Sequence, residues 1–201
     1  LMLLEDPWSY YAGCTPEANH ELMLREYIKH YNISKSELET FNIALAEIAV
    51  ANHKNALLND HAQYQREISV EAVLNERRRS QKPLGLYDFA PISDGATALV
   101  LASSDQAKKA KDTAIRVVGS ASATDYVTYP AREERAQFTA STIAVDNALK
   151  MADINIGNIQ IAELYDQSTF LEMISFEDLG FSKRGMAWQD IAESLKENQG
   201  F

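Results

Sequence analysis

A short basic run is the clearest set of side chains that could bind a charged ligand. Residues 77–79 are all arginines and Lys82 follows, in a chain whose formal net charge is -10. Phosphate recognition needs cations free of internal partners, and arginine can also stack on adenine. The same residues could form a solvated helix end, neutralised by nearby Glu71 and Glu76. Phosphate binding and a solvated surface are both open interpretations.

Cysteine and histidine offer little further chemistry. The single cysteine, Cys14, precedes a helix start at Thr15-Pro16, and a helix N-terminus is one environment that makes a cysteine reactive. One cysteine can form neither an intrachain disulfide framework nor a multi-cysteine metal site. The four histidines lack ligand spacing such as His-x-x-x-His, so we expect no metal site.

Composition limits the classes of partner. The chain has 201 residues, of which 46% are hydrophobic, so it can bury a real core. Its acidic balance opposes broad attraction to nucleic acid, and no apolar run is long enough to span a membrane. The low cysteine content fits a reducing cytoplasm. The first residues show neither a basic leader nor an initiator Met. We therefore expect the chain to be a processed or truncated piece.

The first half of the chain reads as helical. Apolar spacing predicts a helix over 17–31, with Thr15 as its cap and Pro16 in its first turn. The pair Ser34 and Glu37 forms a capping-box pattern before a second helix that should end near Asn52. A third, short helix is predicted from Ser69 into the arginine run.

The second half alternates strands with helices. Continuous or weakly alternating apolar runs predict strands over 96–102, 114–123 and 159–164. Helices are expected between and after them, over 104–111, over about 130–152, and from a Thr169 cap with Glu172 as its capping-box partner. For the long helix we predict a buried stripe that consists of Phe138, Ile143, Ala144, Ala148 and Met151. The pattern indicates an α/β class, with a break near residues 88–93.

Three stretches together resemble the thiolase superfamily, in particular its archaeal and sterol-carrier-protein-type branch. One is Asn52-His53, followed by Ala56, Asn59 and Ala62-Gln63-Tyr64. Another is the run Pro-Ile-Ser-Asp-Gly-Ala-Thr-Ala over 91–98. The last is Ala-Glu-Leu-Tyr-Asp-Gln-Ser-Thr over 162–169, followed by Glu-Asp-Leu-Gly-Phe over 177–181. The stretches span most of the chain.

The resemblance implies a thiolase-like α/β fold. In that case residues 1–88 would be the helical loop domain, 89–103 would hold the last strand of the first half, and 104–201 would be most of the second half. The family's nucleophilic cysteine would lie upstream of this segment, and its Gly-His-Pro and second-cysteine motifs beyond it. Cys14 would therefore be an ordinary loop-domain residue.

The resemblance also implies site residues. The family places a hydrogen-bond donor between a strand and a helix, where it stabilises the thioester oxygen; here that position is Tyr165, followed by Asp166. A phenol can donate such a bond, or act as acid or base if its pKa is lowered, but it cannot replace a near-neutral imidazole. The alternative is that Tyr165 merely packs at a strand end.

Coenzyme A contacts follow from the same resemblance. In this family a basic residue just before a proline meets the adenosine phosphate, which implies Lys82, with Arg78 beside it. Ala90 and Ser93 would lie near the pantetheine. The polar cluster of His53, Asn59 and Gln63 is expected to be structural.

Three functions remain open on this basis. The leading one is acyl transfer on acyl-coenzyme A, with coenzyme A as substrate and no covalently bound cofactor. A second is retro-aldol cleavage of a β-hydroxyacyl thioester, because thiolase-like aldolases resemble this chain in having tyrosine at position 165. A third is a non-catalytic thiolase-like subunit that holds an OB-fold or zinc-ribbon partner. The family resemblance further implies a homodimer.

Overall fold

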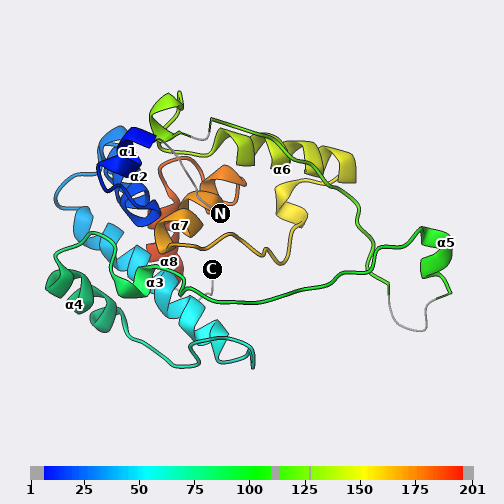
Figure 1. The fold of residues 1–201 in the computed structure, drawn as a ribbon, viewed down its shortest axis with the longest axis horizontal. Coiled ribbons are helices and arrows are strands. Elements are labelled where there is room, and N and C mark those ends of the chain that lie inside the picture. Colours follow the sequence, from blue (N-terminus) through cyan, green and yellow to red (C-terminus); the bar gives the residue numbers. More distant parts are fainter. Residues whose placement is uncertain (1–6, 110–113, 127, 197–201) are drawn as a thin grey trace.

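The computed structural model describes residues 7–109, 114–126 and 128–196 (Figure 1). Within these residues every regular element is helical. The elements are α1 (Pro7–Tyr11), α2 (Pro16–His30), α3 (Leu38–Ala56), α4 (Val70–Ser80), η1 (Leu86–Asp88), α5 (Ser104–Ala107), η2 (Tyr129–Ala131), α6 (Thr139–Ala152), η3 (Ile156–Asn158), α7 (Thr169–Asp178) and α8 (Ala187–Lys196).

Local capping explains where the early helices begin. The Thr15 side chain accepts a hydrogen bond from the Ala18 amide, and the Ser69 side chain accepts one from Ala72. Each bond satisfies a backbone donor that the first helical turn leaves free. The predicted starts of α2 and α4 are thus confirmed.

The second helix differs from its prediction at both ends. Ser34 and Glu37 do bond to each other, at 2.8 Å from the Ser34 amide and 2.6 Å from its hydroxyl. They form a turn before α3, which begins at Leu38 and runs on to Ala56. The predicted end near Asn52 was therefore one turn early, because the polar run that follows it still satisfies its backbone within the helix.

The later helices also shift. The helix predicted over about 130–152 begins only at Thr139, since the Phe138 amide donates to the Asp178 carboxylate, 3.1 Å away, instead of joining a preceding turn. The cap of α7 is Ser168, which accepts from Leu171, so the predicted Thr169 and Glu172 capping box was wrong by one residue. Helix α5 ends at Ala107; part of its predicted range lies outside the described residues.

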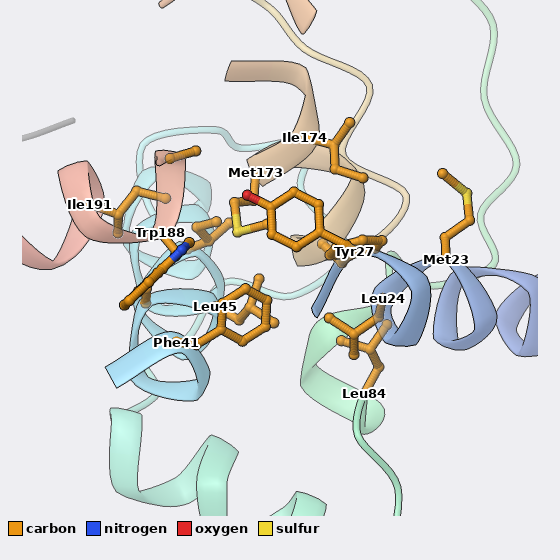
Figure 2. Close-up of a cluster of buried hydrophobic side chains, with 14 of the residues drawn as sticks. Met23, Leu24, Tyr27, Phe41, Leu45, Leu84, Met173, Ile174, Trp188 and Ile191 are labelled. Atoms are coloured by element: carbon orange, nitrogen blue, oxygen red, sulfur yellow. The ribbon is translucent and has the colours of Figure 1, made fainter. Parts of the chain in front are cut away.

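The main core lies among four helices (Figure 2). Tyr27 of α2, Phe41 of α3 and Phe170 of α7 are fully buried, and the Tyr27 ring meets the other two with centroids 5.7–6.0 Å apart. Trp188 of α8 contacts Phe41 edge-on, at 6.0 Å. Helix α8, which the sequence pattern did not predict, therefore completes this core. Helices from both sides of residue 88 share it, and the predicted domain division stays a prediction.

A buried carboxylate fixes the start of α8. Glu177 accepts from the Tyr27 hydroxyl at 2.5 Å, from the Gly185 amide at 2.9 Å and from the Ala187 amide at 3.0 Å. Gly185 has a φ of +78°, and a β-carbon there would lie 2.4 Å from the Tyr31 ring. Only glycine fits this close, left-handed turn. Burial, with Glu177 alongside, raises the pKa of the Tyr27 hydroxyl above its ordinary range.

The three predicted strands are extended segments that lack ladder pairing among the described residues (Figure 1). Their apolar side chains face outward; Leu99 and Val100 are 85% and 96% exposed. A strand satisfies its backbone only through neighbouring strands, and the described chain supplies none at these places. The strand assignments are therefore wrong for this structure at the level of hydrogen bonding, although the segments are extended.

The stripe predicted to be buried is wrong for α6 itself, although Phe138, the residue before the helix, is partly buried against the main core. No residue of α6 is buried, and Ile143 and Met151 are exposed. The helix packs on α7 and beside the extended segment at Gly119, where a β-carbon would lie 2.3 Å from the Ala148 carbonyl oxygen. With no sheet against it in the described chain, the apolar face of α6 stays open. None of the described helices is long and apolar enough to cross a membrane.

Candidate functional site

A buried ion pair holds the loop before residue 90 against α7. Arg77 donates to Asp88 at 2.8 Å through Nε and at 2.5 Å through Nη2. The Asp88 carboxylate also accepts from the Thr169 hydroxyl at 2.8 Å and the Gly85 amide at 2.7 Å. Each carboxylate oxygen of Asp88 is thus paired, which a buried charge requires. The network joins α4, η1 and the first turn of α7.

Backbone pairing extends this junction toward residue 165. Phe89 and Ser168 form an isolated antiparallel bridge, and the Ala90 amide donates to the Gln167 carbonyl at 3.1 Å. Two segments that are distant in sequence are therefore fixed side by side.

Two cavities lie near these segments and share part of their lining. The smaller, about 220 Å³, lies between the C-terminal end of α3, residues 62–64 and residues 87–93. The larger, about 930 Å³, is bounded by α3, the extended segment 159–164, α7 and α8. Asn52 and Asp166 line both. They mark the place where the two cavities meet.

One carboxyl group of the larger cavity has a strongly shifted pKa. Burial raises the pKa of Glu172 to about 7, and the negative charge of Asp166 adds to the rise. The Asn52 amide donates to Glu172 Oε2 at 2.6 Å, which counteracts part of it. A carboxyl that titrates near neutrality beside a cavity is a feature of functional sites.

Known proteins resemble this chain over most of its length. Residues 121–200 match the family model described as thiolase C-terminal domain-like. The chain is 32% identical, over 98% of its length and 49% of the relative's, to an acetyl-CoA acetyltransferase of Methanothermobacter thermautotrophicus. The chain belongs to the thiolase superfamily.

Two further similarities concern proteins named as aldolases. A steroid side-chain-cleaving aldolase of Thermomonospora curvata is 29% identical over 92% of this chain and 47% of its own length. The solved structure of a protein named Ltp2-ChsH2(DUF35) aldolase superposes with a TM-score of 0.78, at 29% identity, over 89% of this chain and 46% of that one. These similarities confirm the thiolase-like α/β fold class, although the described residues form no paired strands. The chain spans about half the length of the curated relatives it matches.

Tyr165, which the resemblance predicts as the hydrogen-bond donor, is open to solvent. Its side chain is 68% exposed, and its hydroxyl donates to the Gln167 side-chain oxygen at 2.5 Å. Tyr165 lines neither cavity, whereas Asp166, the next residue, lines both. The structure thus brings Asp166 into the site and leaves the phenol at its edge. No packing explains Tyr165, since it is not part of either apolar cluster of the described chain.

The predicted pantetheine contacts lie together. Ala90 and Ser93 both line the smaller cavity, and the Ser93 hydroxyl donates to the Gln63 side chain and, at 3.2 Å, to the Pro91 carbonyl. Gln63 and His53, which the sequence pattern assigned as structural, line the same cavity. His53 Nδ1 also lies 3.1 Å from the Arg66 carbonyl oxygen, so it braces the loop after α3.

The basic run divides into a structural and a surface part. Arg77 is buried against Asp88 and is not available to a ligand. Arg78 is exposed and donates to Asn75 at 2.7 Å, and Lys82 is exposed near Glu17. In the described chain neither Arg78 nor Lys82 forms an ion pair, and Glu76 accepts from the Leu86 amide instead. Arg78 and Lys82 line neither cavity.

Sequence reasoning missed the Asn52 and Glu172 pair. The sequence pattern assigns Glu172 to a capping box, although the one-residue shift of the cap moves it further into the first turns of α7. The two side chains are 120 residues apart in sequence. A single sequence carries no signal that pairs them, although the short spacing from Asp166 to Glu172 is compatible with a second carboxyl group near the turn.

Proposed function

We propose that this chain takes part in thiolase-like acyl transfer on coenzyme A thioesters. The observation that carries the proposal is the junction of two cavities at Asn52 and Asp166, directly beside the Tyr165 turn. The similarity to an acetyl-CoA acetyltransferase supports the same substrate class. The smaller cavity would take the pantetheine arm and the larger one the acyl group.

Tyr165 would act as a donor to the thioester oxygen. Its hydroxyl now donates to Gln167 in a solvent-exposed hydrogen bond, which a bond to a ligand oxygen can replace at little cost. The turn also precedes α7, whose N-terminus favours negative charge nearby. Negative charge that develops on the thioester oxygen would then be stabilised by the phenol. Asp166, next to it, would orient the reacting groups at the cavity junction.

The coenzyme A end would use the exposed cations. Arg78 and Lys82 have no carboxylate partner in an ion pair among the described residues, which phosphate binding requires. Ala90 and Ser93 would contact the pantetheine where they line the smaller cavity. The domain division at residue 88 belongs to the same proposal, since the cavity is built across it.

A retro-aldolase is the second candidate, and Tyr165 favours it. Cleavage requires a base that removes the proton of the β-hydroxyl group. The bond between the α and β carbons then breaks, and its electron pair moves into a thioester enolate that a donor such as Tyr165 would stabilise. The similarity to two proteins named as aldolases supports this reaction.

A non-catalytic, partner-holding subunit is the third candidate. The name of the similar solved structure includes a second component, ChsH2, with a DUF35 designation. A partner of the OB-fold or zinc-ribbon kind could cover the exposed extended segments of this chain. A homodimer in the cytoplasm remains our proposal for the assembly and its location.

Product analysis of the whole protein tests these alternatives. We would incubate it with an acetoacetyl thioester plus coenzyme A, and separately with a β-hydroxyacyl thioester without coenzyme A. Thiolysis that falls about 10²–10³-fold in Tyr165→Phe would support acyl transfer with a donor role. The exposed Tyr126 offers a matched control, because Tyr126→Phe should leave the rate unchanged.

Each alternative has its own outcome. Thiolysis that survives Tyr165→Phe would sink the role of that residue. Retro-aldol products without added coenzyme A would replace the acyltransferase proposal by the aldolase. No turnover of either thioester would leave the partner-holding subunit.

A further inference from the structure

The wall of the larger cavity is acidic. Among the described residues that line it are the four carboxyl groups of Glu163, Asp166, Glu172 and Asp190, and no lining side chain is basic. Helix α3 contributes only neutral residues to this wall, α8 contributes Asp190, and the segment 159–166 contributes two acids. No charged residue of α2 or α6 lines it. Acids that share a site without a cation favour a state in which one of them holds a proton.

Glu172 differs from the other three acids. Glu163, Asp166 and Asp190 are more exposed, whereas Glu172 is largely covered within α7. Glu172 also accepts a hydrogen bond from another side chain, the Asn52 amide, at 2.6 Å. Among the described residues, no such bond is seen for the other three carboxyl groups of this wall. Burial and the Asp166 charge both favour its neutral form.

Protonation of Glu172 would change its hydrogen bond with Asn52. An ionised carboxylate only accepts, so it must face the Asn52 NH₂ group, as it does here. A neutral carboxyl can donate its O–H to the Asn52 carbonyl oxygen, which would release the NH₂ group. Because Asn52 lines both cavities, the released donor would be available to a ligand at their junction.

We propose that Glu172 is a positioning residue of the site, which holds one proton and thereby sets the orientation of the Asn52 amide between the two cavities. This inference rests on the proposed function only where it concerns turnover. The proton exchanges with solvent through the cavity, and no other bond forms or breaks.

An NMR titration without substrate tests whether Glu172 holds a proton that sets the Asn52 amide. In the whole protein labelled with 13C at glutamate side chains and 15N at asparagine side chains, the Glu172 carboxyl signal should titrate near pH 7. The Asn52 side-chain amide signal should shift with the same midpoint, and that shift should vanish in Glu172→Gln. A Glu172 signal that stays constant between about pH 6 and 8, or an Asn52 shift that persists in Glu172→Gln, would overturn the inference.

The pH profile of turnover tests whether the protonation of Glu172 affects catalysis. For the wild type, kcat/KM with the thioester should change about tenfold per pH unit on one side of an inflection near pH 7. Glu172→Gln should lose this inflection while the protein stays folded, and Glu172→Asp should restore an inflection at a shifted pH. Glu47 of α3, another partly buried glutamate whose pKa burial raises, is the matched control; Glu47→Gln should keep the wild-type profile.

The two proposals can fail separately. Turnover with an inflection that survives in Glu172→Gln would overturn the positioning role and leave the proposed function standing. A Glu172 titration that moves the Asn52 amide, in a protein with no turnover, would support the proton-dependent pairing and overturn the proposed function.

Discussion

Large apolar side chains are buried in the four-helix core but exposed in the extended segments. Phe41 and Tyr27 are fully buried among α2, α3, α7 and α8, whereas Leu99 and Val100 in an extended segment are almost fully exposed. A helix satisfies its own backbone and needs only one apolar face covered, while a strand depends on neighbours for both. The structure of the helical core therefore follows largely from local sequence, whereas the structure of the extended segments depends on partners that are distant in sequence.

The largest contrast should come from side-chain truncation. We expect Phe41→Ala to lower the free energy of unfolding by about 3–5 kcal/mol, because it empties a fully buried site. Leu101→Ala, in an 83% exposed position, should change it by less than about 0.5 kcal/mol. Urea unfolding of this chain measures both. Equal losses would show that the extended segment is buried and would break the comparison.

The buried ion pair should come next. Arg77→Met leaves Asp88 charged and without its guanidinium partner, which typically costs about 3 kcal/mol or slightly more. Arg79→Met, two residues away on the exposed side of α4, is the matched control and should cost about 0.5 kcal/mol or less. If thermal denaturation gave both variants the same stability, the Asp88 network would not hold the site together.

Glu172 should make the stability of the folded protein depend on pH. Its pKa in the folded chain, about 7, lies above its ordinary value of 4.5, so the folded state binds the proton more tightly. Its contribution is therefore complete below pH 4.5 and is lost as the pH rises through 7. Relative to wild type, Glu172→Gln should gain stability as the pH rises from about 5 to about 8. A difference in melting temperature that is constant across this range would contradict the shift.

Helix caps should show the same regional contrast at the smallest scale. Ser168→Ala removes a buried cap of α7 and should cost about 1 kcal/mol. Ser103→Ala removes the cap of the short, exposed α5, where the bond is 3.4 Å long, and should cost only a few tenths. Chemical denaturation of both variants would detect the difference. A larger loss for Ser103→Ala would place α5 within the folded core.

The success of sequence reasoning follows the same division. The caps Thr15 and Ser69 were predictable because their partners lie three residues away. Ser168 and Thr169 can both cap a helix, so the pattern alone could not choose between them. Burial along α6 and pairing of the extended segments depend on partners that no local pattern specifies. For that reason the pattern predicted paired strands and a buried Ile143.

The candidate site was predictable only in part. The resemblance singled out Ala90, Ser93 and Asp166, and all three line the smaller cavity, while their roles stay predictions. It could not show that Arg77 is used internally, nor that Glu172 meets Asn52 across 120 residues. Those contacts arise from the packing of α3 and α4 on α7, which depends on the whole fold.

Hydrogen exchange on the whole protein, with and without acetyl-coenzyme A, tests the central claim that the cavity junction binds the thioester. We predict slower exchange in peptides that cover residues 52–64, 88–93 and 165–172, which surround the two cavities. The peptide that contains α5 (Ser104–Ala107), which lines neither cavity, should be unchanged. Protection confined to other parts of the chain, or no protection at saturating ligand, would contradict the account.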